Sequence, residues 1–113
     1  MDQIVHICSL EDWQAAQAAG KYQSDSLEAE GFIHCSRPEQ VVDVANRYYR
    51  GRTDLLLLWI DLSKLASELR WEPSEGDVYP HLYGQLNLTS VLRVSAFPPD
   101  TDGVFRSLPK PSS

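Results

Sequence analysis

The sequence predicts a compact α+β fold in a single domain. At 113 residues the chain suits one domain with a sizeable core. The expected elements run strand, helix, strand, helix, and then several strands with little helix between them. A doubly wound parallel sheet would need a helix between successive strands, so this order favours the α+β class.

The chain opens with a strand and a helix. The stretch QIVHIC predicts a strand in which Ile4, His6 and Cys8 share one face. Ser9 follows as the N-cap of a helix with an acidic first turn. Gly20 is expected to end that helix as its C-cap.

A second strand lies in the stretch EGFIHCS. Residues 21–30 precede it and predict a loop with one helical turn, which either covers a site as a lid or simply connects two elements. Strand alternation places His34 on one face, with Ile33 and Cys35 on the other. A titratable imidazole is thus set where an ordinary strand would carry an aliphatic side chain.

The rest of the body predicts one more helix and several strands. Ser36 is expected to start the helix as N-cap, with Glu39 completing a capping box and Tyr49 near its end. The unbroken apolar run from Leu55 to Ile60 is typical of a strand buried on both faces. Shorter strands are expected at 69–72, 79–84 and 91–97, with a turn at 73–77.

Composition sets the domain bounds and limits the partners. We expect one domain over residues 1–97 and a loose tail rich in proline and serine over 98–113. A net charge of −6 disfavours duplex nucleic acid and anionic membrane as partners. No signal peptide or membrane span is predicted. Two cysteines without a CxxC spacing suit a cytoplasmic protein, with a disulfide the lesser alternative.

The three histidines are the candidate catalytic residues. His6, His34 and His81 all lie in apolar, strand-like surroundings, and imidazole titrates near neutral pH. Each one alone is more simply explained as a buried neutral histidine bonded to backbone, but three together favour a shared cleft. A three-histidine metal site is the lesser alternative, because no two histidines have the spacing typical of metal ligands.

Other residue types add candidates for ligand contacts. Tyrosines near strand ends can stack on a planar ligand, and three carboxylates border apolar runs. The tyrosines are Tyr22, Tyr79 and Tyr83, and the carboxylates are Glu30, Asp61 and Glu72. Cys35 is expected to pack in the core, because the neighbouring His34 points to the opposite face and cannot serve as its base. No dinucleotide, P-loop or HExxH motif is present.

The ordered motifs resemble a bacterial family of short proteins known as domain of unknown function 952. They are HICS, Trp13, Gly20-x-Tyr22, Ser26-Leu27, EGFIHCS, Gln40, LLLLWID, Trp71-Glu72 and PHLYG. The resemblance runs from about Ile4 to Phe97, nearly the whole chain.

That family is in turn similar to the ADP-ribosyltransferase fold, which implies mixed or antiparallel sheets with two main helices. The resemblance implies that His6, with Ser9 after it, holds the nicotinamide ribose. GFIHCS resembles the second strand motif of those enzymes. PHLYG occupies the position of the third, where His81 stands in place of the usual glutamate. A histidine cannot supply the same negative charge to an oxocarbenium-like transition state, so ordinary ADP-ribosyl transfer is disfavoured.

The leading hypothesis is a cleft that binds NAD or a related nucleotide-like ligand, with glycosyl or phosphoryl transfer if it is catalytic. His6 would hold the ribose, His34 would line the nicotinamide side, and His81 would act as acid/base or phosphate contact. The residues expected to bind the ligand are Ser9, Tyr22, Ser36 and Tyr83. The alternatives are a non-catalytic module for a small metabolite or protein partner, and a metal-dependent hydrolase built on the three histidines.

Overall fold

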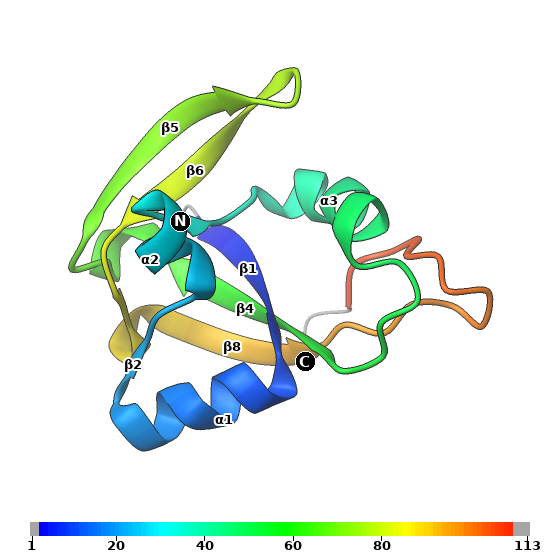
Figure 1. Ribbon diagram of the computed structural model, residues 1–113, viewed down its shortest axis with the longest axis horizontal. Coiled ribbons are helices and arrows are strands. Elements are labelled where there is room, and N and C mark those ends of the chain that lie inside the picture. The colour runs from blue at the N-terminus through cyan, green and yellow to red at the C-terminus, as the bar shows by residue number, and fades with distance from the viewer. Residues whose placement is uncertain (1–2, 110–113) are drawn as a thin grey trace.

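Three antiparallel strands form the main sheet, in the order β1–β4–β8 (Figure 1). β1 (Gln3–Ser9) pairs with β4 (Leu55–Asp61), and β4 pairs with β8 (Val91–Ala96). The computed structural model describes residues 3–109. The predicted doubly buried strand is therefore the central one, and the α+β class is confirmed.

The first helix begins and ends where the sequence predicts. α1 spans Leu10–Ala19, and the Oγ of Ser9 accepts a hydrogen bond from the backbone N–H of Asp12 at 3.1 Å. Gly20 ends the helix with a φ of 80°, a conformation that glycine adopts without steric cost. Within residues 3–109, no helix is long and apolar enough to cross a membrane.

The start of the helix after residue 36 differs from the prediction. A 3₁₀ turn at Pro38–Gln40 comes first, and α3 (Val41–Tyr48) follows it. Gln40, not Glu39, closes the turn, because its Oε1 accepts the backbone N–H of Arg37 at 2.9 Å. The capping side chain lies one residue later than predicted because the chain enters the helix through a tighter 3₁₀ turn.

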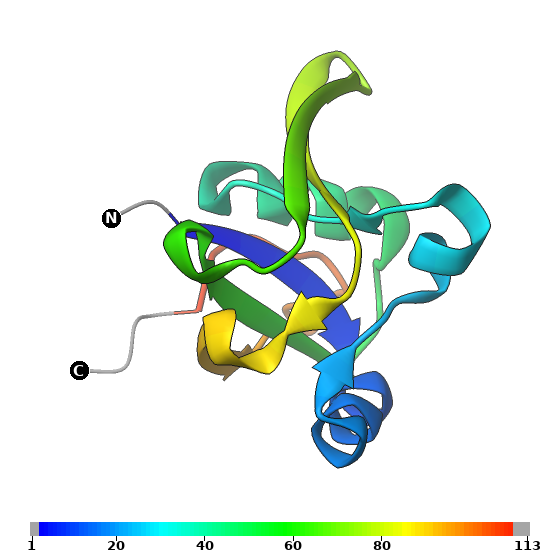
Figure 2. The same cartoon turned by 90° about the vertical axis from the view of Figure 1, so that its left-hand side faces the viewer.

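A second antiparallel sheet has the order β3–β6–β5. It consists of β3 (Ile33–His34), β6 (Asp77–Tyr83) and β5 (Glu68–Ser74). β5 and β6 form a long hairpin that projects from the body of the molecule (Figures 1 and 2). Its strands are longer than expected, because the turn predicted at 73–77 is confined to the two residues between Ser74 and Asp77.

The segment 33–36 joins the two sheets. Ser36 and Val5 exchange backbone hydrogen bonds of 2.8 and 2.9 Å with each other, and the N–H of Cys35 donates to the carbonyl of Pro80 at 3.1 Å. Ser36 is therefore held in extended backbone by β1. This pairing explains why it does not act as the predicted helix N-cap.

Residues 21–30 form ordered structure rather than a loop. β2 (Lys21–Tyr22) pairs with β7 (Leu86–Asn87), and α2 (Asp25–Glu30) extends the single helical turn that the sequence predicts. The remaining short 3₁₀ turns are Leu62–Lys64 and Leu88–Ser90.

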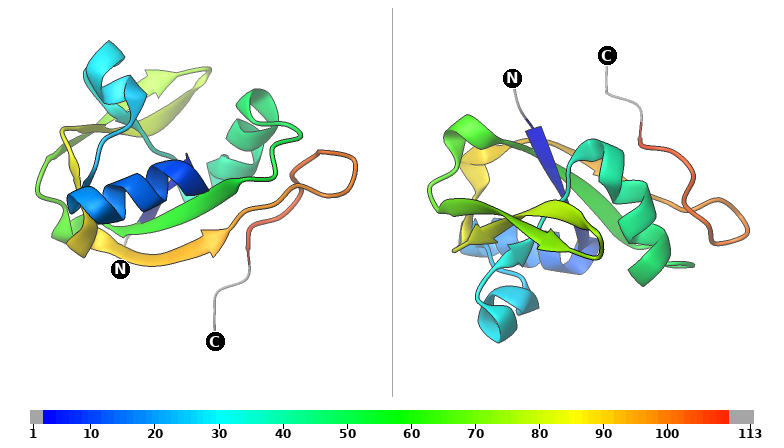
Figure 3. Two further views of the ribbon diagram at one scale, coloured as in Figure 1. Left: turned by 60° about the horizontal axis from the view of Figure 1, so that its bottom comes forward. Right: turned by 90° about the horizontal axis from the view of Figure 1, so that it is seen from above.

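The main sheet is buried on both faces, in two separate cores. Ile4 and Cys8 of β1 face one core, which contains Ala16 of α1 and apolar residues of the second sheet. Val5 and Ile7 face the other core, beneath α3. Figure 3 shows α1 and α3 at different sides of the sheet. The alternation predicted for β1 is confirmed, and it leaves His6 on the face of the first core.

The chain after β8 packs against the body, contrary to the loose tail predicted for 98–113. Phe105 is buried and its ring centroid lies 4.9 Å from that of Phe97. The side chain of Asn46 in α3 donates to the carbonyl of Phe105 and accepts its N–H, both at 2.7 Å. Figures 1 and 3 show this segment turning back beside α3. One aromatic side chain with a backbone anchor thus outweighs the polar composition. Residues 110–113 lie outside the described part of the chain.

Phe105→Ala should therefore destabilise the fold. Removing a buried phenylalanine costs about 3 kcal/mol through lost burial and the cavity left behind. Urea unfolding followed by circular dichroism measures the change. Arg106→Ala is the control, because its side chain is half-exposed and bonds only to aspartates of the same loop, and it should cost well under 1 kcal/mol. An equal effect of the two substitutions would contradict the packing described for Phe105.

Candidate functional site

Two adjoining hollows lie between β1, α3 and the second sheet. The smaller hollow has a volume of about 290 Å³ and the larger one about 600 Å³. Both are lined by His34, Ser36, Val44 and Tyr49. We refer to the two hollows together as the cleft, since these four residues belong to both parts.

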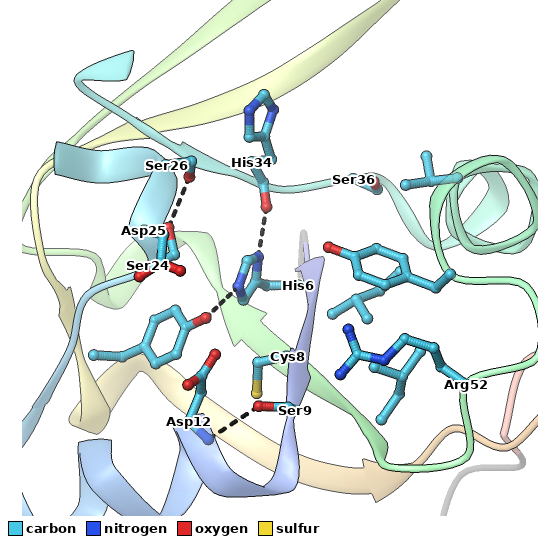
Figure 4. Close-up of a pocket in the computed structure, with 15 residues that line it drawn as sticks. His6, Cys8, Ser9, Asp12, Ser24, Asp25, Ser26, His34, Ser36 and Arg52 are labelled. Atoms are coloured by element: carbon cyan, nitrogen blue, oxygen red, sulfur yellow. Dashed lines mark hydrogen bonds between the residues drawn. The ribbon is translucent and has the colours of Figure 1, made fainter. Parts of the chain in front are cut away.

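His6 projects from β1 into the smaller hollow, and both of its ring nitrogens are bonded (Figure 4). Nδ1 lies 2.5 Å from the backbone carbonyl of His34, and Nε2 lies 2.9 Å from the hydroxyl of Tyr22. A carbonyl can only accept, so Nδ1 carries the proton. Nε2 then accepts from the Tyr22 hydroxyl, which fixes the tautomer of the ring.

Burial keeps the His6 imidazole neutral. Its side chain is 7% exposed, and this loss of solvent lowers the pKa to about 4, although the bond to the His34 carbonyl partly opposes the shift. Burial likewise raises the pKa of Tyr22. The pair is therefore an uncharged hydrogen-bonded unit in the wall of the smaller hollow.

His34 contributes its backbone to His6 and its side chain to the other side of the segment. Figure 4 shows the imidazole pointing away from His6 while the carbonyl points toward it. The Nε2 of His34 lies 2.8 Å from a carboxylate oxygen of Glu30, and both side chains are about half exposed. The rings of His6 and His34 therefore do not meet.

His81 is buried beside a carboxylate. Its Nδ1 lies 2.9 Å from Oε1 of Glu72, and the hydroxyl of Tyr83 donates to the same oxygen at 2.5 Å. The bond from Tyr83, and to a lesser extent the bond from His81, lowers the pKa of Glu72, so its side chain is ionised at neutral pH. An ionised carboxylate accepts only, so Nδ1 of His81 carries the proton.

Aromatic packing fixes the His81 ring. Phe32 stacks on it with 4.2 Å between ring centroids and 19° between planes. The His34 ring meets the His81 ring edge to face at 5.5 Å. His34 and His81 face each other across paired strands, since they are register partners in β3 and β6.

The structure thus brings two of the three histidine rings together, rather than all three. His34 and His81 both line the larger hollow, while His6 lines the smaller one and reaches the others through the His34 backbone. Alternation within β3 turns the His34 side chain away from the sheet that carries His6. The sequence predicts that His6 and His34 lie on strands. It does not predict that their rings lie on opposite sides of the segment 33–36.

The other predicted ligand contacts are divided between the two hollows. Ser9 and Tyr22 line the smaller hollow, and Ser36 lines both. Tyr83 lines neither, because its hydroxyl is directed at Glu72 and its ring faces the guanidinium of Arg70 at 4.3 Å.

Two of the three carboxylates expected near the site have histidine partners. Glu30 bonds to His34 and Glu72 to His81. Asp61 does not belong to the cleft, because its Oδ1 accepts from the backbone N–H and the hydroxyl of Ser63 at the end of β4.

Sequence reasoning missed the charged residues that α1, α3 and the loop after α3 bring to the cleft. Arg52 and Asp12 line the smaller hollow, and Arg47 lines the larger one. Arg52 is paired with Asp54 at 2.8 Å and Arg47 with Glu75 at 3.5 Å. No periodic pattern marks them. Their place at the cleft depends on how the helices and sheets pack together.

The tip of the β5–β6 hairpin is tied to α3 and to the 3₁₀ turn that precedes it. Gln40 donates to the carboxylate of Asp77 and to the carbonyl of Val78, both at 2.9 Å, and Tyr48 donates to Glu75 at 2.8 Å. Glu75 has a φ of 55°, the only positive φ outside glycine in residues 3–109. This left-handed conformation costs about 1 kcal/mol for a residue with a Cβ, and here it directs the carboxylate to α3.

The alternative of a three-histidine metal centre is not supported. In the described part of the chain, no group of three histidine, cysteine, aspartate or glutamate side chains could hold a metal ion. His6 has no free nitrogen, and its ring is separated from the other two. Cys8 and Cys35 are free and buried, and burial raises the pKa of each thiol to about 12, which suits core packing.

Comparison with known proteins identifies the family. Residues 7–94 match the profile of the family described as protein of unknown function DUF952. The chain belongs to this family. A comparison with curated proteins found no match.

Solved structures of one relative share the fold. The crystal structure of protein CC0527 from Caulobacter crescentus is 38% identical, with a TM-score of 0.85 over 92% of this chain and 93% of that one. A crystal structure of a double mutant of CC0527 gives 37% identity and a TM-score of 0.84 over the same shares. The solution structure of CC0527 gives 38% identity and a TM-score of 0.81, covering 94% of this chain and 93% of that one.

Stability should fall as the pH drops from about 6.5 to about 4, because of His6. Over this window an unfolded chain binds a proton at His6 that the folded chain excludes, so protons favour unfolding. A shift of this size corresponds to about 3 kcal/mol at most. Urea unfolding at stepped pH measures the slope.

The matched control is His6→Gln, whose amide can still donate to the His34 carbonyl but does not titrate. It should lose most of the slope between pH 6.5 and 4. A wild-type stability that is flat over this range, or an equal slope in both proteins, would contradict the assignment of His6 as a neutral buried group.

Proposed function

We propose that the cleft binds a nucleotide-like ligand, with NAD as the reference compound. The observation that carries this proposal is that the two hollows share His34 and Ser36 at their junction, and each has one arginine, Arg52 or Arg47. An elongated ligand with phosphates between two end groups matches a two-part cleft with a cation in each part.

The size and the lining of the cleft support this class of ligand. Small-molecule sites have volumes of about 300 to 1,000 Å³. The larger hollow falls in this range, and the smaller one lies just at its lower edge. The smaller hollow carries Asp12 and Asp25, whose carboxylates suit sugar hydroxyls. The larger one carries Tyr79 and Tyr49, whose rings suit a planar base.

The role expected for His6 changes in this proposal. Its nitrogens are both bonded within the protein, so it would act on a ribose only through the Tyr22 hydroxyl that it holds. His34 would line the boundary between the two hollows. His81 would contact the ligand in the larger hollow, as acid/base or as a phosphate contact.

A relationship to the ADP-ribosyltransferase fold stays part of the proposal. Support comes from the position of His6 on the first strand and of GFIHCS on the strand segment that adjoins it. The third motif departs from those enzymes, because His81 occupies the strand position and Glu72 reaches it from β5. Phosphoryl chemistry is therefore favoured over ADP-ribosyl transfer. The free, buried thiols of Cys8 and Cys35 suit the cytoplasm as its location.

A binding module without catalysis is the second candidate. The observation that favours it is the neutral His6–Tyr22 unit, which is fixed by internal bonds and offers no titrating group to the smaller hollow. The same cleft would then hold a small metabolite, and no product would form.

Binding should be detectable with NAD, ADP-ribose and nicotinamide. We expect the phosphate-bearing compounds to raise the melting temperature and nicotinamide alone to do so less, because it cannot contact either arginine. Arg47→Gln and Arg52→Gln should each weaken binding about tenfold or more, the loss of a charged hydrogen bond. Thermal shift and isothermal titration calorimetry measure both effects.

Arg50→Gln is the matched control, since it removes the same charge from an exposed position between the other two arginines and lines neither hollow. It should bind as wild type does. Binding that is unaffected by both cleft substitutions, or no binding of any of the three compounds by folded protein, would refute the proposal.

A further inference from the structure

The Glu72–His81 pair has the geometry of a proton-transfer dyad, beyond the binding role proposed above. Nδ1 of His81 donates to the ionised Glu72, which leaves Nε2 with a free lone pair. In residues 3–109 no group forms a hydrogen bond with this Nε2. The fully buried side-chain nitrogens without a partner are Nε of Arg37 and Nε of Arg93, and Nε2 of His81 is not among them. It is therefore accessible, on a ring that lines the larger hollow.

Everything around the ring fixes its orientation. Phe32 stacks on one face, and Glu72 is itself held by Tyr83 at 2.5 Å. A base whose tautomer is set by a carboxylate and whose plane is set by packing needs no reorganisation before it accepts a proton. A histidine with a purely structural role in the core has both nitrogens bonded, as His6 does, whereas Nε2 of His81 has no partner among the described residues.

The charges of the larger hollow indicate which reaction the base would serve. Arg47 is the cation of its lining, and its two carboxylates are already engaged, Glu30 with His34 and Glu75 with Tyr48 and Arg47. Cleavage of a glycosidic bond develops positive charge and needs a free carboxylate. Transfer of a phosphoryl group concentrates negative charge, which an arginine stabilises.

We propose that His81, positioned by Glu72, is the general base for hydrolysis of a phosphate ester of a nucleotide in the larger hollow. This rests on the proposed binding of a nucleotide-like ligand in the same cleft. Arg47 holds the phosphate, and Glu72 is a positioning residue that does not touch the substrate.

The reaction consumes one water. Nε2 of His81 takes a proton from the water, its oxygen forms a bond to phosphorus, and the bond from phosphorus to the alcohol oxygen breaks. The departing oxygen takes a proton from solvent, and His81 then returns its own proton to solvent. The ring of His34, which meets that of His81 and lines the same hollow, bounds the space in which the ester would lie. The products are a phosphate monoester or phosphate and the free alcohol.

The first test reads the dyad without any substrate. Long-range ¹H–¹⁵N NMR distinguishes the two neutral imidazole tautomers, and we expect His81 to hold the proton on Nδ1. Glu72→Ala should shift it toward the mixture found in solution. Tyr83→Phe is the control, because it removes the other bond to Oε1 but leaves the His81 contact, and the tautomer should not change. An Nε2–H tautomer in wild type would overturn the proposal.

The second test measures hydrolysis of adenosine 2′,3′-cyclic phosphate and bis(4-nitrophenyl) phosphate. His81→Gln should lower the rate about 100-fold or more, the usual contribution of a general base, and Arg50→Gln should leave it unchanged. Glu72→Ala should lower the rate of hydrolysis and change how that rate depends on pH. It serves as the second variant if His81→Gln does not fold.

The outcomes separate the two proposals. Wild-type protein that binds NAD or ADP-ribose but hydrolyses neither ester would overturn the dyad and leave the binding proposal standing. Hydrolysis that depends on His81, without binding of either nucleotide, would support the dyad and refute the NAD-like ligand. Hydrolysis that is equal in wild type and His81→Gln would also overturn the dyad.

Discussion

The hydrogen bond from the His6 ring to the His34 carbonyl is the contact on which the cleft depends. It spans 28 positions in the sequence and joins a side chain of the main sheet to the backbone of the second sheet. A two-residue strand such as β3 provides few ladder bonds of its own, so a buried carbonyl there needs a donor from elsewhere. The imidazole supplies that donor while its other nitrogen accepts from Tyr22. With the adjoining Ser36–Val5 pairing, this contact fixes where the two sheets meet.

The second sheet leaves the main sheet at that junction, and the space between its hairpin and α3 becomes the larger hollow. Apolar packing holds the base of the hairpin, where Leu82 lies in the first core. Its tip is held by polar contacts alone among those described, through Gln40, Tyr48 and Arg47. Such contacts are individually weak at a half-exposed surface. Glu75 and Gly76 both have positive φ, as a tight two-residue hairpin turn requires, and the turn presents the Glu75 carboxylate to α3.

Two histidines are paired with carboxylates in this site, and the third is kept neutral. Glu30 and Glu72 face His34 and His81, whereas His6 is buried and bonded only to neutral groups, the His34 carbonyl and the Tyr22 hydroxyl. The difference follows from the partners, since His6 and His81 are 7% and 6% exposed but only His81 has a carboxylate beside it. A lone charge in the core would cost far more than a hydrogen bond returns. The same residue type therefore serves structure at one position and is free for chemistry at another. The relative of known structure, protein CC0527 from Caulobacter crescentus, shares the fold.

The sequence by itself determined the α+β class, the first helix with both caps, the central apolar strand and the alternation that puts Cys35 in the core and His34 outside it. These follow from local periodicity and turn chemistry, which act over a few residues. Only the tertiary structure decided that Ser36 pairs with β1 instead of capping a helix, that Phe105 returns to the core, and that the rings of His34 and His81 meet while His6 stays apart. It also placed Arg47 and Arg52 at the cleft. Those outcomes depend on contacts between segments 30 to 60 residues apart, such as the Asn46–Phe105 pair at a separation of 59, which no local pattern encodes.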